Sequence, residues 1–149
     1  MSLPEIRDIV PHSGRMLLLD RLVACDAESL TAELTIREDA LFADAHGVGA
    51  WVGIEYMAQA IAAFAGNEAR QRAEKAKIGF LVGTRRYACN VAYFPVGVTL
   101  KIFVRRVEHG VRGVASFECS ITGEGIVAES TVTVIQPENA GNFINGLTA

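Results

Sequence analysis

Apolar and polar residues alternate along much of this chain, with the two-residue period that predicts half-buried β-strands. The clearest example is residues 30–37, where Leu30, Ala32, Leu34 and Ile36 alternate with polar side chains. Similar faces recur over residues 100–104, 115–121 and 132–134, and residues 16–25 and 78–94 are rich in strand-forming residues. Turn-forming glycines separate the later strands, at 108–113 and 122–125. The pattern therefore predicts about six antiparallel strands.

Residues 50–77 follow a different period. Ile54, Met57 and Ile61 recur at spacings of three and four, which predicts an amphipathic helix. The first half of this segment is apolar on nearly every side, so we expect it to be buried. The second half, residues 67–77, is charged and rich in alanine, so we expect it to emerge into solvent.

The order of these elements predicts the fold class. Two strands come first, then one long helix, then four strands, and a single central helix is buried on most sides only if the sheet curls around it. We therefore expect an α+β fold in which a curled antiparallel sheet wraps a long central helix. Residues 1–137 form one domain in this interpretation, and residues 138–149, rich in Asn and Gly, form a loosely held tail.

Composition narrows the function classes. Half of the 149 residues are hydrophobic and 21% are charged, which supports one buried core and excludes an intrinsically disordered chain. The net charge of −3 argues against nucleic acid as a partner, because neutralising phosphates requires a basic surface. No apolar run is long enough to cross a bilayer, and the first residues lack the apolar core of a secretory signal. We therefore expect a cytoplasmic protein with no membrane partner.

The cysteines predict neither a disulfide framework nor a metal site. Cys25, Cys89 and Cys119 are odd in number and widely spaced, and no Cys/His spacing is typical of zinc. Their neighbours are strand-like, so we expect them to act as small core residues. The sequence calls for no metal and no organic cofactor.

Glu55 breaks the apolar pattern most clearly. It lies between Ile54 and Tyr56 in the helix half that we expect to be buried, and Gln59 follows one turn later on the same face. A buried carboxyl group must be paired or must take up a proton. Two interpretations stay open: Glu55 pairs with an arginine or caps a loop as a structural residue, or it carries chemistry.

Two histidines are further candidates. His46 lies just before the helix, beside glycines that let a backbone approach a ligand, and it is suited to act as a general base or is simply solvated. His12 precedes the first strand and is either structural or lines a pocket. The basic residues are ordinary surface charges or together form a basic patch for an acidic partner; they are Arg85, Arg86, Arg105, Arg106, Lys75 and Lys77.

Three segments occur in a specific order along the chain: PHSGRMLLLDRLV, GIEYMAQAIAAFAG and GFLVGTRRYACNVAYFPVGVTLKIFVRRVE. In this order they resemble the Leu-Pro-His segment with its strand, the central helix with Ile-Glu-Ala-Met-Ala-Gln, and the Gly-Tyr-Leu-Val-Gly strand pair of one family. That family is the hot-dog-fold 3-hydroxyacyl-(acyl carrier protein) dehydratases. The resemblance covers almost the whole chain, to the strand that ends near Ile135.

The resemblance implies a hot-dog fold and the dehydration of 3-hydroxyacyl thioesters on acyl carrier protein to trans-2-enoyl thioesters. In that family a loop histidine removes the proton at C2, a helix carboxyl protonates the leaving hydroxyl, and N–H groups at the helix start hold the thioester carbonyl. By this match Glu55 takes the carboxyl role and His46 the role of base. The match also makes substrate-binding candidates of Ala50, Gly49, Trp51, Gln59 and His12.

The loop FADAHGVGAWVG is shorter than the loop of those enzymes. The short loop and Trp51 resemble a divergent branch found in aryl-polyene-type biosynthetic clusters, in which a dehydratase-like protein can pair with a second hot-dog protein. The resemblance therefore implies a homodimer or higher oligomer, or a heterodimer, with an acidic carrier protein docked on the basic residues.

Two other functions stay open. The chain is an acyl thioesterase of the hot-dog fold if Glu55 directs water onto the thioester, because the fold alone does not decide the chemistry. It is a non-catalytic subunit if it only supports a dehydratase partner. The sequence leaves acyl-chain length open as well.

Overall fold

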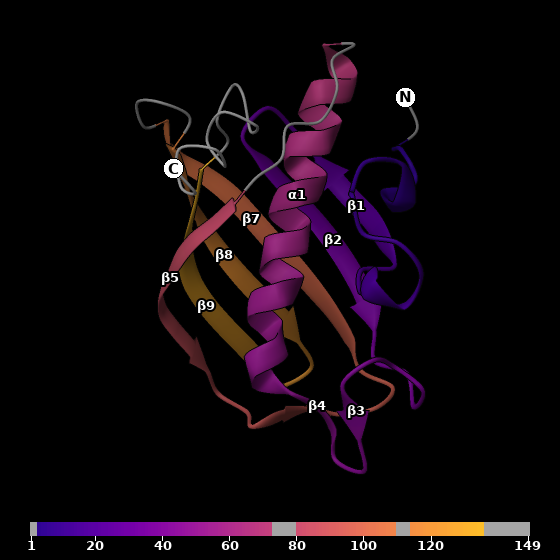
Figure 1. Cartoon of the computed structure of the whole chain (residues 1–149). Coiled ribbons are helices and arrows are strands. Elements are labelled where there is room, and N and C mark those ends of the chain that lie inside the picture. The colour runs from indigo at the N-terminus through magenta and orange to yellow at the C-terminus, as the bar shows by residue number, and fades with distance from the viewer. Residues whose placement is uncertain (1–2, 73–79, 110–113, 136–149) are drawn as a thin grey trace, which may run out of the picture.

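The computed structural model describes residues 3–72, 80–109 and 114–135 (Figure 1). The expected tail at 138–149 lies outside the described residues, as do Lys75 and Lys77. Within the described part, the chain forms one long helix and a large antiparallel sheet, as the alternation of residue types predicts.

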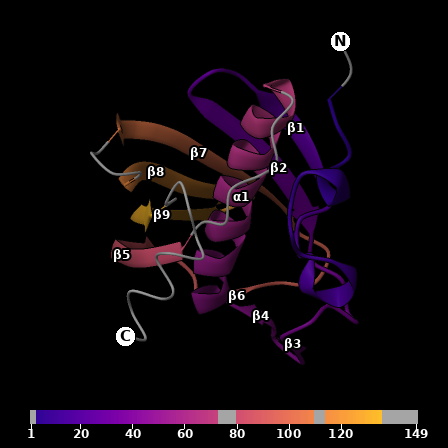
Figure 2. The ribbon, with the colours of Figure 1, turned by 45° about the horizontal axis from the view of Figure 1, so that its top comes forward.

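The large sheet has six strands in the order β1-β2-β7-β8-β9-β5, and every neighbouring pair is antiparallel. This count and orientation confirm the prediction for the described residues. The sheet curves around the helix without closing on itself (Figures 1 and 2). The strands are β1 Arg21–Cys25, β2 Ser29–Thr35, β5 Phe80–Cys89, β7 Thr99–His109, β8 Val114–Gly123 and β9 Ile126–Ile135.

The long helix, α1 (Gly53–Gln71), follows a 3-10 turn, η3 (Ala50–Val52), and lies across the concave face of the sheet (Figure 2). Met57, Ala60 and Phe64 are at most 2% exposed, and the Phe64 ring meets Phe117 of β8 edge-on at 5.6 Å. The opposing sheet face presents buried apolar side chains at alternate positions, as the two-residue period predicts. They include Leu30, Ala32 and Leu34 of β2, Leu100, Ile102 and Val104 of β7, and Phe117, Cys119 and Ile121 of β8.

The helix emerges into solvent later than expected. Asn67 and Ala69 are only 7% and 9% exposed, and the exposed surface begins at Arg70. The cause is packing against the end of β1, where the Asn67 amide donates a hydrogen bond to Cys25 Sγ at 3.2 Å. A sequence rich in charge and alanine therefore still contributes buried positions.

The N-terminal segment crosses α1 at Gly66. It contains two short 3-10 turns, η1 (Ile6–Asp8) and η2 (Gly14–Met16). A Cβ atom at Gly66 would lie 1.8 Å from the carbonyl oxygen of Ile9, so only glycine permits this approach of backbone to helix. The crossing places residues 10–18 beside the first half of α1.

A second, small sheet joins the segment just before the helix, where the sequence indicates only a loop, to residues 93–94, at the end of a segment that it predicts to be rich in strand. Its strands are β3 (Ala43–Asp44), β4 (Gly47–Gly49) and β6 (Tyr93–Phe94), and Val48 pairs with Phe94. Strands of two or three residues carry too little alternation to be predicted from sequence.

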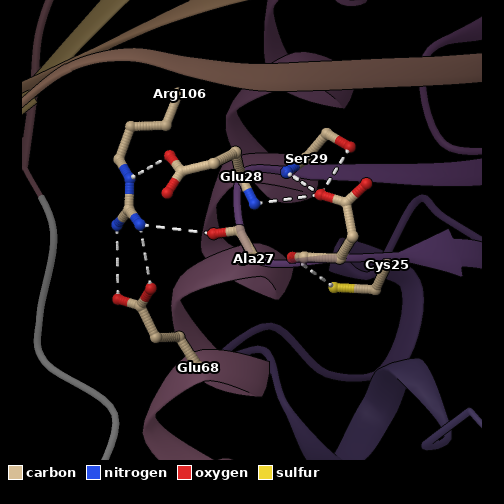
Figure 3. A network of polar contacts seen from close by, with 7 residues as sticks. Cys25, Ala27, Glu28, Ser29, Glu68 and Arg106 are labelled. Carbon is tan, nitrogen blue, oxygen red and sulfur yellow. Dashed lines mark hydrogen bonds and ion pairs between the residues drawn. The ribbon is translucent and has the colours of Figure 1, made fainter.

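A charged cluster ties the far half of α1 to the sheet (Figure 3). Arg106 of β7 donates two hydrogen bonds to the Glu68 carboxylate, at 3.1 and 3.3 Å, and one to Glu28 at 3.3 Å. Its guanidinium also lies 4.9 Å from the centre of the Phe64 ring. Burial alone would lower the pKa of Arg106, but hydrogen bonds and charges from Glu68 and Glu28 raise it. We call these residues the Arg106 cluster.

Candidate active site

Glu55 lies in the first turn of α1, where the helix dipole favours a negative charge. Its side chain is 42% exposed, so it is not sealed in the core as the apolar pattern suggests. Its neighbours Ile54 and Tyr56 differ in burial, and Tyr56 is 2% exposed. The helix therefore presents Glu55 at the boundary between core and surface.

Gln59 fixes one oxygen of Glu55. It is completely buried, and its Nε2 donates to Glu55 Oε1 at 3.1 Å and to the Met16 carbonyl at 2.7 Å. Its Oε1 accepts the Leu18 N–H at 2.9 Å, which determines which way the amide faces. The predicted adjacency of Gln59 and Glu55 on one helix face is confirmed, and Gln59 also fastens the N-terminal segment to the helix.

His12 meets the same carboxyl oxygen. Its Nε2 lies 3.6 Å from Glu55 Oε1, which is ion-pair range and slightly too long for a hydrogen bond. Its Nδ1 is buried and has no hydrogen-bond partner among the residues that the structure describes. The sequence indicates only that His12 lines a pocket or is structural. The contact with Glu55 depends on the crossing of the N-terminal segment, which carries no local sequence signal.

A groove of about 370 Å³ opens beside Glu55. Among the described residues that line it, Glu55 is the one ionisable group and the others are apolar. Two of the walls are aromatic and solvent-facing: Trp51 is 66% exposed, and Phe42 is 45% exposed and meets Trp51 edge-on at 5.6 Å. The lining residues are Met16, Leu18, Leu41, Phe42, Trp51, Val52, Ile54 and Glu55. The groove suits an apolar chain whose polar end lies at a carboxyl group.

The aromatic wall of the groove, formed by Phe42 and Trp51, has a strained backbone at Phe42 and close packing at Gly49. Phe42 adopts a φ of +73°, a left-handed conformation that bulky residues rarely take. A Cβ at Gly49 would lie 2.5 Å from Trp51 Nε1, so glycine is what lets the indole pack over the preceding backbone. Gly49 thus shapes the groove through Trp51. Sequence reasoning identified Gly49 and Trp51 but missed Phe42, Leu41 and Met16.

The start of the helix is held from β5. The Tyr87 hydroxyl donates a hydrogen bond to the Ala50 carbonyl, which also accepts the Gly53 N–H. In a planar trans peptide, the N–H of Trp51 points opposite to the Ala50 carbonyl, so Tyr87 sets the direction of that N–H. Burial is the main cause that raises the pKa of Tyr87 to about 12, which keeps its hydroxyl protonated as a donor.

The Ala50 N–H itself is already engaged, because it donates to the Ala92 carbonyl at 2.9 Å. The first N–H groups of a helix have no acceptor within the helix, so Trp51 and Val52 supply the next donors along the chain. Sequence reasoning placed the thioester-binding N–H at Ala50 and had no means of finding the bond to Ala92, which joins residues far apart in sequence.

His46 lies in the turn between β3 and β4 and is exposed. Its backbone N–H donates to Asp44 Oδ1 at 2.7 Å, and its ring lies 5.2 Å from the Tyr93 ring. It is not among the residues that line the groove. The structure of this one chain therefore brings Glu55, Gln59 and His12 together and leaves His46 apart from them.

No arginine or lysine pairs with Glu55 in the described part of the chain. Two of the arginines proposed as a basic patch are paired with carboxylates instead: Arg105 with Glu118, and Arg106 with Glu28 and Glu68. The guanidinium groups of these two are therefore already in contact with carboxylates of the same chain. Arg85 and Arg86 are exposed on β5.

The cysteines are free and lie on strands, with Cys119 buried and Cys25 and Cys89 half-buried, as predicted. Among the described residues, no group of histidines, cysteines and carboxylates could hold a metal ion. No helix in those residues is long and apolar enough to cross a membrane.

Comparison with solved structures identifies the architecture as the hot-dog fold. The dehydratase heterocomplex ApeI:P from Xenorhabdus doucetiae matches with a TM-score of 0.88 and 24% identity, over 99% of this chain and 100% of that one. The smu.793 protein from Streptococcus mutans, bound to acetyl CoA, matches at 0.57 and 15% identity, over 76% and 85%. A hypothetical thioesterase with coenzyme A from Streptococcus pneumoniae matches at 0.58 and 11% identity, over 79% and 88%.

The family model of the ApeP-like dehydratases matches residues 4–145. The chain therefore belongs to the ApeP-like dehydratase family, and the resemblance inferred from its three segments is confirmed. A comparison with curated proteins finds no match.

Proposed function

We propose that this protein dehydrates 3-hydroxyacyl thioesters carried by an acyl carrier protein, giving trans-2-enoyl thioesters and water. The observation that carries this proposal is Glu55. In a chain of the ApeP-like dehydratase family, this carboxyl group lies at the wall of an apolar groove. Gln59 holds one of its oxygens, and no lysine or arginine of the described ranges pairs with it. A carboxyl without a fixed cation can hold and release a proton during a reaction.

In the proposed reaction, a base removes the proton at C2, and the electron pair forms the C2–C3 double bond. The C3–O bond breaks, and Glu55 gives its proton to the leaving hydroxyl, which departs as water. Negative charge develops on the thioester oxygen as C2 loses its proton, so donors near that oxygen stabilise the transition state. The Trp51 and Val52 N–H groups at the helix start are the donors that we assign to it.

We assign the base to an imidazole supplied at a subunit interface. His46 stands apart from Glu55 in one chain, so it serves as the base only if a second hot-dog subunit brings the two groups together. The similar ApeI:P protein is a heterocomplex, which supports a hot-dog heterodimer here. A homodimer that places His46 of one subunit beside Glu55 of the other would serve equally well.

A thioesterase reaction is the second candidate. Two of the similar hot-dog structures are a hypothetical thioesterase with coenzyme A and a protein bound to acetyl CoA. In that reaction Glu55 would direct water onto the thioester carbonyl, and the C–S bond would break. A subunit that only supports a catalytic partner is the third.

Product analysis separates the three functions. A 3-hydroxyacyl carrier protein is incubated with the full chain, alone and with a second hot-dog subunit, and the carrier is examined by intact mass spectrometry. Dehydration lowers the carrier mass by one water with the thioester intact, whereas hydrolysis yields a free acid and a free thiol.

Glu55→Ala and His46→Ala are then compared separately in the active assembly. Loss of the enoyl product in the Glu55 variant supports the proposal. If neither variant changes activity in the assembled complex, this chain is not the catalytic subunit.

A further inference from the structure

The environment of His12 points to a role beyond lining a pocket. Its Nε2 lies 3.6 Å from Glu55 Oε1, while its Nδ1 is buried with no hydrogen-bond partner in the described residues. The two nitrogens of this ring therefore differ sharply in surroundings. One faces a carboxyl group, and the other finds neither a donor nor an acceptor among the residues that the structure describes.

This difference selects a tautomer. A proton on Nδ1 would leave a buried N–H donor unsatisfied, in the neutral Nδ1–H form and in the imidazolium alike. The neutral form with its proton on Nε2 leaves Nδ1 as a buried acceptor instead, but of the two neutral forms it alone turns an N–H, and not a lone pair, toward the Glu55 oxygen. The ring then presents an N–H to the carboxyl group at ion-pair range and does not act on it as a base.

The same oxygen of Glu55 already accepts a bond. Gln59 Nε2 donates to Oε1 at 3.1 Å, and the Gln59 amide cannot rotate because Leu18 and Met16 occupy its other positions. Two N–H groups therefore face Oε1. An oxygen that accepts one N–H and faces a second nitrogen at 3.6 Å is a poor place for a proton, so an acidic Glu55 carries its proton on Oε2.

We propose that His12 is a positioning residue that, together with Gln59, confines the transferable proton of Glu55 to Oε2. This inference rests on the function proposed above, in which Glu55 gives that proton to the leaving hydroxyl. In this proposal, a single chain orients the acid Glu55, with residues from α1 and from the N-terminal segment. His46 has no part in orienting the acid, and its proposed role is that of the base.

The N-terminal segment is fastened on both sides of His12, which is what a positioning role requires. Before it, the Ile9 carbonyl packs against Gly66 of α1, at a distance that a Cβ atom would abolish. After it, Met16 and Leu18 bind the buried Gln59 through their backbone. His12 is thus held against Glu55 by backbone contacts on either side and not by its own side chain.

Two matched substitutions test the proposal in the full chain, with its hot-dog partner where activity requires one. His12→Gln places an amide N–H near the position of Nε2 and keeps a donor for Glu55. His12→Asn places its amide near Nδ1 and leaves Glu55 without that donor. We expect His12→Asn to lower kcat about 10-fold or more with KM within about twofold, and His12→Gln to recover most of the loss.

Equal losses in the two variants, unchanged kcat in His12→Asn, or a rise in KM alone would each overturn the proposal. The last outcome would return His12 to simple substrate binding. A second readout does not depend on any variant: ¹⁵N NMR of the unaltered protein is expected to show His12 protonated on Nε2 and bare on Nδ1. Protonation on Nδ1 would overturn the proposal even if both variants failed to fold.

Glu55→Gln keeps this test distinct from that of the proposed function. Full dehydratase activity in Glu55→Gln means that this chain does not supply the acid of the reaction, so the role proposed for it fails. Loss of activity in Glu55→Gln together with full activity in His12→Asn means that only the role of His12 fails.

Discussion

Two carboxylates on one helix have opposite surroundings. Glu68, in the far half of α1, accepts two hydrogen bonds from the Arg106 guanidinium, which Glu28 also contacts. Glu55, in the first turn, contacts a neutral amide and an imidazole and borders an apolar groove. The same residue type on the same helix thus meets a guanidinium at one position and an apolar groove with neutral side-chain amide contact at the other.

The difference separates structure from chemistry. A carboxylate against a permanent cation stays ionised and contributes to stability, because removing either partner leaves the other charge in a partly buried place. A carboxyl beside neutral donors can take up and release a proton near an apolar substrate. The structural interpretation that the sequence left open for Glu55, pairing with an arginine, describes Glu68.

The largest effect on stability that we expect is at Gln59, which supports the Glu55 region. Gln59→Leu keeps the shape but leaves the Leu18 N–H and the Met16 carbonyl without their buried partner. We expect a loss of about 2–4 kcal/mol in the free energy of unfolding, measured in urea. The matched control is Gln71→Leu at the exposed end of α1, with an expected change within about 0.5 kcal/mol. Equal losses of stability in Gln59→Leu and Gln71→Leu would show that the buried hydrogen bonds of Gln59 do not stabilise the Glu55 region.

Arg106→Met tests the other region. It leaves Glu68 without its cation, removes the Arg106 bond to Glu28 and removes the contact with Phe64, so we expect a loss of about 2–3 kcal/mol. The neighbouring Arg105→Met removes only a surface pair with Glu118, in which both side chains are more than half exposed, and should cost about 0.5 kcal/mol. Urea unfolding of both variants measures the contrast. Similar losses would mean that the Arg106 cluster is an ordinary set of surface charges.

Glu68→Gln should have a smaller effect, about 1 kcal/mol, because the amide still accepts one bond from Arg106. Thermal unfolding measures this loss. Activity per folded molecule should stay within twofold of that of the unaltered protein. A large fall in activity with little change in stability would show that Glu68 also takes part in catalysis, contrary to the structural role given to it here.

Tyr87→Phe should have the smallest effect, about 1 kcal/mol or less at neutral pH, from the lost bond to the Ala50 carbonyl. The pKa of Tyr87 is raised to about 12 by burial, so the hydroxyl stays neutral in the folded protein after it would ionise in the unfolded chain near 10. Its contribution is therefore complete below pH 10 and is lost as pH rises from 10 toward 12. Denaturation measured over that range should show the gap between the two proteins narrowing, and a constant gap would contradict the account.

Much of the fold could be predicted from the sequence, because residues that alternate in twos or recur in threes and fours must bury one face. Glu55 could be found because it violates that pattern, and Gln59 because helix geometry places it one turn away. His12 could not be assigned to Glu55. Its position depends on Ile9 packing against Gly66, a contact between distant segments that produces no periodicity.

The start of the helix shows the same limit. Ala50 matched a position in a family motif, but a motif gives no information on where a backbone N–H points. The bond from Ala50 to Ala92 follows from the small sheet, whose strands are too short to leave a pattern. Trp51 and Phe42 are exposed, and only the folded structure shows that they line the same groove.

The central claim is that Glu55, and not Glu68, carries the chemistry of α1. The most direct test measures kcat for dehydration of a 3-hydroxyacyl carrier protein by Glu55→Gln and Glu68→Gln, each in the active assembly and corrected for the folded fraction. We predict that Glu55→Gln lowers kcat by about 10²–10⁴-fold, the usual effect of losing a general acid, while Glu68→Gln stays within twofold. Equal activity in the two variants would contradict the account.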